Sequence, residues 1–148
     1  MGKKNKFIIG LNEIDQVVDF LKDQFKVCKI FAFYGPLGAG KTTLVRNLLR
    51  GSGVIDLITS PTFTYLNLYK NKAGQKFCHF DLYRIDKLKD FLAAGFDEYL
   101  YDPEIINFIE WPEVIESLLK EGVCKVKIDY HTDPDKRAMN IEVFGKKV

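Results

Sequence analysis

Residues 29–51, KIFAFYGPLGAGKTTLVRNLLRG, contain the pattern that decides the fold. The first seven residues are almost wholly apolar or aromatic, which is typical of a central strand covered on both faces. A glycine-rich turn follows and runs into a helical segment that Gly51 or Gly53 can end. A buried strand, a glycine-rich turn and a helix in this order are the context in which a phosphate-binding loop occurs.

The turn satisfies the motif G-x-x-x-x-G-K-[ST] over residues 35–42. Glycines let backbone N–H groups turn inward around phosphate oxygens, and the following helix points its positive end at them. We expect Lys41 to reach the β- and γ-phosphates, Thr42 to ligate Mg²⁺ and Thr43 to contact the α-phosphate. A turn that only caps a helix would not explain the lysine. The expected nucleotide-binding residues of this loop are Gly35, Pro36, Leu37, Gly38, Ala39, Gly40, Lys41, Thr42 and Thr43.

The remaining sequence mixes βα units with meanders. Apolar residues at helical spacing predict a helix over residues 13–26, and we expect one or two short helices over 87–101 and a helix over 112–122. Strands are expected at residues 7–9, 62–70, 76–83, 106–110, 123–130 and 138–144. We therefore expect an α/β fold of the P-loop NTPase-like type, with a mixed parallel and antiparallel sheet between helices on both faces, in three layers.

Length and composition set further limits. A chain of 148 residues with 47% hydrophobic and 28% charged residues is expected to form one soluble domain, residues 1–148. The net charge of +2 and four arginines argue against direct nucleic-acid binding. Lysines gather at the two ends, where we expect solvated tails: Lys3, Lys4, Lys6, Lys146 and Lys147. No apolar stretch reaches 18 residues, and MGKKNKFIIG (1–10) lacks the apolar h-region of a signal peptide, so we expect a cytoplasmic protein without a membrane span.

Two carboxylates follow apolar runs, Asp81 in HFDLYR and Glu110 in FIEWPE. A P-loop enzyme needs an acid at a strand end, to hold Mg²⁺ directly or through water, and a group that orients the attacking water. Either acid could fill either role. We therefore predict Lys41, Asp81 and Glu110 as catalytic residues, and Thr42, Asp81 and Glu110 as the metal site.

With these residues assembled, the chain resembles the TsaE family, small P-loop ATPases of tRNA threonylcarbamoyladenosine (t6A) biosynthesis. The resemblance rests on GPLGAGKTTLVR (35–46), SPTFTYLNLY (60–69), HFDLYRI (79–85) and FIEWPE (108–113), in the family's order and spacing. Many NTPases share the first motif, whereas the other three together are specific to this family.

The resemblance implies roles for further residues. It places a switch-like segment near the γ-phosphate, formed by Ser60, Pro61, Thr62 and Thr64. Thr62 then joins the nucleotide-binding set, Asp81 is a catalytic or metal-linked acid, and Glu110 is the Walker B acid near Mg²⁺.

The positions and partners of four further side chains near these motifs are also predicted, some with an alternative. Trp111 is expected beside the nucleotide or a partner surface, with core packing as the alternative. Arg137 lies near the nucleotide or caps the last hairpin, Arg84 pairs with an acid of the motif, and His79 is structural or faces a partner.

By the same resemblance, ATP and Mg²⁺ are the expected ligands. ATP hydrolysis would support a complex of TsaB and TsaD, which transfers a threonylcarbamoyl group to adenosine 37 of tRNA, so that tRNA is contacted only through the complex. Hydrolysis by the chain alone is expected to be slow, because no arginine finger is obvious within it. The alternatives are a small-molecule kinase, which usually carries an arginine-rich lid, and a nucleotide-gated binding module without significant turnover.

Overall fold

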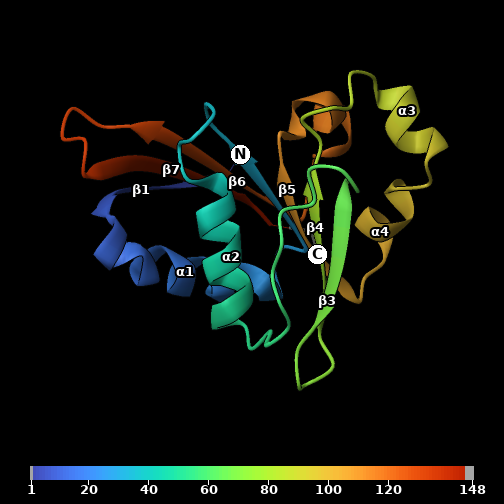
Figure 1. Cartoon of the computed structure of the whole chain (residues 1–148), viewed down its shortest axis with the longest axis horizontal. Helices are drawn as coiled ribbons and strands as arrows, with labels where there is room; N and C mark the ends of the chain where they lie inside the picture. Colours follow the sequence, from blue (N-terminus) through green and yellow to red (C-terminus); the bar gives the residue numbers. More distant parts are fainter. Residues whose placement is uncertain (1, 146–148) are drawn as a thin grey trace.

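A single mixed sheet of seven strands forms the centre of the computed structural model, which describes residues 2–145 (Figure 1). The strand order is β1-β7-β6-β2-β5-β4-β3. Strands β4, β5, β2 and β6 are parallel, whereas β3, β7 and β1 are each antiparallel to a neighbour. The strands are β1 (Lys3–Gly10), β2 (Ile30–Tyr34), β3 (Leu66–Lys70), β4 (Lys76–Asp81), β5 (Ile105–Glu110), β6 (Val123–Tyr130) and β7 (Lys136–Phe144). The predicted mixed sheet is confirmed.

Helices cover both faces of the sheet, as the sequence predicted (Figure 1). One face packs against α1 (Ile14–Asp23) and α2 (Lys41–Gly51). The other packs against α3 (Leu88–Ala93), α4 (Asp97–Tyr101) and the 3₁₀ helix η3 (Pro112–Leu118). Within residues 2–145, no helix has the length and apolar character needed to cross a membrane.

Phenylalanine rings fix the strands that carry the acids. Phe108 on β5 is fully buried, and its ring centroid lies 5.7 Å from that of Phe31 on β2 and 5.8 Å from that of Phe77 on β4. Such aromatic pairs contribute about 0.5–1.5 kcal/mol each beyond the area they bury. Because side chains alternate along a strand, Phe108 and Glu110 share the face that α2 covers. The aromatic core therefore sets where Glu110 meets the helix after the glycine-rich loop.

Two segments differ from the sequence-based expectations. The helix predicted over 112–122 is wrong: η3 is a 3₁₀ segment that ends at Leu118 and kinks at Ile115, where φ is −111°. Val114 and Ile115 are β-branched neighbours, which disfavours a regular helix, and the kink accompanies full burial of Ile115. The strand predicted over 62–70 begins only at Leu66, because residues 61–65 form a turn in which the Tyr65 N–H donates to the Pro61 carbonyl at 2.8 Å.

The structure also differs from the expectations at the two ends of the predicted helix 13–26 and at the N-terminal lysines. Short 3₁₀ segments, η1 (Leu11–Glu13) and η2 (Gln24–Lys26), flank α1. Lys3, Lys4 and Lys6 are exposed to solvent as expected, but they lie in β1, paired with β7, and do not form a tail. The strand is longer than predicted because it pairs along eight residues. Lys146 and Lys147 lie outside the described residues.

Candidate functional site

The glycine-rich loop connects β2 to α2 at the carboxyl end of the parallel strands, where α/β proteins bind ligands. Gly35 has a φ of +155°, and a Cβ there would collide with the Ile128 carbonyl, so a side chain is excluded. Gly40 has a φ of +111° directly before α2, a conformation that only glycine adopts readily. Both glycines are therefore required by the backbone path of the loop.

Two side chains from the β6–β7 hairpin hold the loop from outside. The Tyr130 hydroxyl donates to the Leu37 carbonyl at 2.5 Å, and Arg137 Nε donates to the Ala39 carbonyl at 3.2 Å. Because the C=O and the following N–H of a peptide point in opposite directions, the N–H groups of Gly38 and Gly40 face away from this hairpin. The loop thus presents donors on its other side, as phosphate binding requires.

Arg137 caps the last hairpin, which is one of the two alternatives that the sequence left open. Its guanidinium also donates to the carbonyls of Pro134 and Lys136, at 3.1 and 2.9 Å, and so caps the hairpin. Tyr130 was missed by the sequence analysis. Its partner Leu37 lies 93 residues away, and no local pattern signals such a contact.

A pocket of about 430 Å³ opens beside the loop. Four separate segments line it, and they bring together most of the predicted site: Lys41, Thr42 and Thr43; Ser60 and Thr62; Asp81, Tyr83 and Arg84; Glu110 and Trp111. Gly35, Pro36, Ala39 and Arg137 do not line this pocket. Ala39 and Arg137 line a second pocket of about 350 Å³, which shares Gly38, Gly40 and Thr43 with the first.

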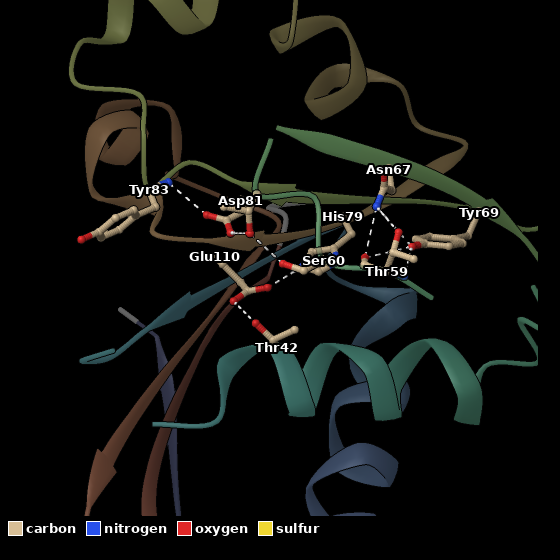
Figure 2. Close-up of polar contacts among 10 residues, drawn as sticks. Thr42, Thr59, Ser60, Asn67, Tyr69, His79, Asp81, Tyr83 and Glu110 are labelled. Carbon is tan, nitrogen blue, oxygen red and sulfur yellow. Dashed lines mark hydrogen bonds and ion pairs between the residues drawn. The ribbon is translucent and has the colours of Figure 1, made fainter. Parts of the chain in front are cut away.

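Glu110 lies against the start of α2. The Thr42 hydroxyl donates to Glu110 Oε1 at 2.7 Å, and His79 Nε2 lies 2.6 Å from Glu110 Oε2 (Figure 2). This contact forms because β5 is the strand directly beside β2, whereas β4 is one strand further away. Of the two acids, Glu110 is the one that contacts the helix after the loop.

His79 is buried, with 1% of its surface exposed, so the expectation that it could face a partner is wrong. Its strand β4 runs parallel to β5, and this places it on the same face as Glu110. A carboxylate only accepts hydrogen bonds, so Nε2 carries the proton that bridges the two side chains. Nδ1 is buried and has no partner among residues 2–145.

Asp81 has different partners. Its Oδ1 accepts from the Tyr83 N–H at 3.1 Å, and its Oδ2 accepts from the Thr62 hydroxyl at 3.4 Å. Thr62 and Ser60 are linked by a hydrogen bond of 2.9 Å between their hydroxyls. Asp81 therefore ties the predicted switch-like segment to the end of β4. Thr64, expected near the phosphate, instead donates to the Leu66 carbonyl at 3.3 Å and does not line the pocket.

The charge of Lys41 is held inside the pocket. Its ammonium donates to the Gly35 carbonyl at 2.5 Å and lies 3.2 Å from the centroid of the Trp111 ring. Burial lowers the pKa of Lys41 and outweighs the nearby carboxylates of Glu110, Glu113 and Asp81, which raise it. An anion that shares the pocket would relieve this unfavourable burial.

Trp111 takes a left-handed backbone conformation, with φ and ψ both 56°, directly after β5. This conformation is unusual for a bulky residue. It accompanies a ring that lines the pocket, packs against Tyr83 at a centroid distance of 5.0 Å and contacts the Lys41 ammonium. Trp111 therefore lines the pocket, is only partly buried, and also packs against the hydrophobic core on one face of the sheet.

Arg84 does not pair with an acid, so that expectation is wrong within residues 2–145. Its guanidinium carbon instead lies 4.6 Å from the centroid of the Phe63 ring. Both acids of the motifs already have other partners, as described above.

The oxygen donors beside the loop suit a small, hard cation. Residues 2–145 hold no group of three or more His, Cys, Asp or Glu side chains arranged around a metal position. Mg²⁺ does not need such a cage, because it keeps several waters and is bound through one or two protein oxygens plus phosphates. The Thr42 hydroxyl and the Glu110 carboxylate, in contact at 2.7 Å, are ligands of the kind that fits it.

Comparison with known proteins gives one consistent family. The family described as "Threonylcarbamoyl adenosine biosynthesis protein TsaE" matches residues 10–139. The chain is 40% identical over 112 residues to the tRNA threonylcarbamoyladenosine biosynthesis protein TsaE of Haemophilus influenzae, which covers 76% of this chain and 67% of that protein. It is 36% identical over 115 residues to the protein of the same name from Borreliella burgdorferi, covering 76% of this chain and 82% of the other.

The fold is also shared with a solved structure. The crystal structure of YdiB from Bacillus subtilis superposes with a TM-score of 0.72 at 27% sequence identity. The match covers 98% of this chain and 88% of the other.

Proposed function

The chain belongs to the TsaE family of threonylcarbamoyl adenosine biosynthesis proteins, and on that premise we propose that it binds and hydrolyses ATP. The observation that carries the proposal is the meeting of Lys41, Thr42 and Glu110 in one pocket beside a glycine loop whose N–H donors face inward. Each of these groups matches a need of phosphoryl transfer, which depends on positioning and charge stabilisation.

In this proposal Lys41 leaves the Trp111 ring and the Gly35 carbonyl to lie between the β- and γ-phosphates. Thr42 and Glu110 would hold Mg²⁺, which would neutralise charge on the phosphates. Asp81, which accepts hydrogen bonds from the Thr62 hydroxyl and the Tyr83 N–H, would orient the attacking water. The roles of the two acids thus follow from their different partners.

We propose that the nucleoside extends into the second pocket. That pocket shares Gly38, Gly40 and Thr43 with the first, and it is lined by apolar side chains suited to a base: Ile9, Leu11, Ile14 and Met139. Residues 71–74, NKAG, lack the aspartate of the guanine-reading N-K-x-D pattern. ATP is therefore the expected nucleotide in preference to GTP.

We further propose that hydrolysis serves a complex of TsaB and TsaD that modifies adenosine 37 of tRNA, with tRNA held by the complex. Three exposed apolar side chains support a protein partner near the mouth of the pocket: Leu37, Phe63 and Tyr83 are 71%, 79% and 58% exposed. Apolar exposure of this kind is typical of protein interaction sites.

Calorimetric titration with ATP·Mg²⁺ tests the proposal. Lys41→Ala is expected to weaken binding about 10- to 100-fold, because a charged donor to phosphate is lost. Lys127→Ala, an exposed lysine outside the pocket, is the matched control and should bind as the unaltered chain does. Unchanged affinity in a folded Lys41→Ala protein would overturn the assignment. A pull-down with TsaB and TsaD, with and without ATP, tests the partners.

A further inference from the structure

Arg84 lies shortly after the end of β4, in a segment whose backbone is held by hydrogen bonds. The Leu82 N–H donates to the Glu110 carbonyl at 3.1 Å, and the Ile85 N–H donates to the Leu82 carbonyl at 3.0 Å. The Tyr83 N–H is held by Asp81 Oδ1 at 3.1 Å. The start of the Arg84 side chain is therefore positioned by the same residues that form the candidate site.

The Arg84 side chain lines the 430 Å³ pocket beside Ser60 and Thr62. Among the described residues that line this pocket, Lys41 and Arg84 are the cations. Lys41 lies deep, at the start of α2, whereas Arg84 is exposed. A triphosphate whose inner part is held by Lys41 and the loop would extend toward the segments that carry Arg84.

Arg84 is held only weakly by its neighbours. Its guanidinium lies over the ring of Phe63, which is 79% exposed, and it forms no ion pair within residues 2–145. An exposed cation–π contact shifts an equilibrium by only about 2- to 5-fold. A phosphate group, which a guanidinium binds with two parallel hydrogen bonds, competes easily with such a contact.

We propose that Arg84 is a catalytic residue that binds the γ-phosphate of ATP, an arginine finger supplied by the chain itself. The inference rests on the proposed ATPase function and departs from the expectation, drawn from the sequence, that no arginine finger is obvious within the chain. In hydrolysis the water oxygen bonds to the γ-phosphorus, and the bond from that phosphorus to the β–γ bridging oxygen breaks. The electron pair stays on ADP, the proton of the water passes to solvent, and Arg84 stabilises the charge on the transferred group.

The contact with Phe63 gives Arg84 a resting position. Phe63 lies in the turn of residues 61–65, whose ends are fixed by the hydrogen bond from the Tyr65 N–H to the Pro61 carbonyl. The turn therefore does not depend on the Arg84 contact. If Arg84 is catalytic, substitution of Arg84 should impair catalysis and substitution of Phe63 should not. If the contact only supports the structure, the two substitutions should have similar effects.

The test compares Arg84→Ala, Arg84→Lys and Phe63→Ala by calorimetry with ADP·Mg²⁺, with and without aluminium fluoride, a mimic of the transferred phosphoryl group. In the unaltered chain, aluminium fluoride should increase the affinity for ADP·Mg²⁺. Both Arg84 variants should bind ADP·Mg²⁺ with an affinity within about 2-fold of that of the unaltered chain. They should, however, lose most of the increase in affinity that aluminium fluoride causes. Their kcat for ATP hydrolysis should fall at least ~100-fold with little change in KM. Phe63→Ala should keep the increase in affinity that aluminium fluoride causes.

Three outcomes would overturn the inference. Arg84→Ala could retain the increase in affinity, Phe63→Ala could lose it to the same degree, which would indicate a role in the turn, or the unaltered chain could show none. Failure of the proposed function is a separate result, because the unaltered chain would then bind neither ATP·Mg²⁺ nor ADP·Mg²⁺.

Discussion

The ammonium group of Lys41 lies 3.2 Å from the centroid of the Trp111 ring, which places the expected phosphate-binding charge on the only indole of the chain. The same ammonium donates to the Gly35 carbonyl. If the proposed function holds, Lys41 would exchange these partners for phosphate oxygens. Nucleotide binding would then change the surroundings of Trp111, a side chain with its own optical signal.

Trp111 fluorescence should therefore report this exchange. Addition of ATP·Mg²⁺ is expected to change the intensity or wavelength of the emission, because a charge leaves the face of the ring. Lys41→Ala should shift the emission in the absence of nucleotide and should not respond further to ATP. Identical spectra for Lys41→Ala and the unaltered chain would show that the contact does not exist in solution.

The two acids should respond differently to removal of their charge. Glu110→Gln is expected to lower Mg²⁺-dependent hydrolysis about 10- to 100-fold, because the carboxylate beside Thr42 is lost. The variant should remain folded, since the volume of the side chain is almost unchanged. Hydrolysis is measured across a Mg²⁺ titration and unfolding by urea.

Asp81→Asn is the matched comparison for Glu110→Gln. It should lower the rate of hydrolysis without raising the Mg²⁺ concentration that gives the half-maximal rate, because Asp81 contacts Thr62 and Tyr83 and not Thr42. If Asp81→Asn raised that concentration and Glu110→Gln did not, the assignment of the two acids would have to be exchanged.

His79 is expected to act as a positioning residue for Glu110. His79→Leu removes the donor 2.6 Å from Glu110 Oε2 and should weaken Mg²⁺ binding about 10- to 100-fold, as substitution of outer-shell partners of metal ligands does. His79→Gln, whose amide can still donate a hydrogen bond, should retain most of the Mg²⁺ affinity. Mg²⁺ titrations of ATP binding measure the effect. Equal losses in the two variants, or a loss only in stability, would indicate that His79 merely fills space.

Much of the site could be predicted because its signals are local. The loop of residues 35–42 and the acids that end β4 and β5 each lie in a short motif, and apolar runs predicted a strand leading into each one. The strand order could not be predicted, because pairing of β5 with β2 is a long-range contact that no periodicity encodes. That order decides which acid meets Thr42.

The contacts that the sequence missed are all between distant segments. His79 and Glu110 are 31 residues apart and meet only because β4 and β5 pair in a particular register. Arg84 and Phe63 meet because residues 61–65 turn instead of continuing β3. The turn follows from the backbone of Tyr65, whose φ of +69° is rare for an aromatic residue and is not predicted by β propensity.

The hairpin of β6 and β7 supports the glycine-rich loop from outside through Tyr130 and Arg137. Tyr130→Phe removes only the hydroxyl that donates to the Leu37 carbonyl, and one such hydrogen bond corresponds to about 2- to 13-fold in affinity. We expect ADP·Mg²⁺ to bind that much more weakly, since the Gly38 N–H is then less firmly aimed at phosphate. Tyr101→Phe, an exposed tyrosine that lines neither nucleotide pocket, is the control and should leave the affinity unchanged.

Arg137→Met should weaken binding further than Tyr130→Phe, because it removes donors to three carbonyls, including that of Ala39. The Arg137 guanidinium also lies 5.1 Å from the centroid of the Tyr130 ring, so the two supports are in contact. Their effects on binding should therefore not add, with a coupling of at least about 0.5 kcal/mol in a double-mutant cycle measured by calorimetry. Additive effects would mean that each side chain holds its own carbonyl independently. Unchanged affinity in both single variants would mean that the loop keeps its donors inward without the hairpin.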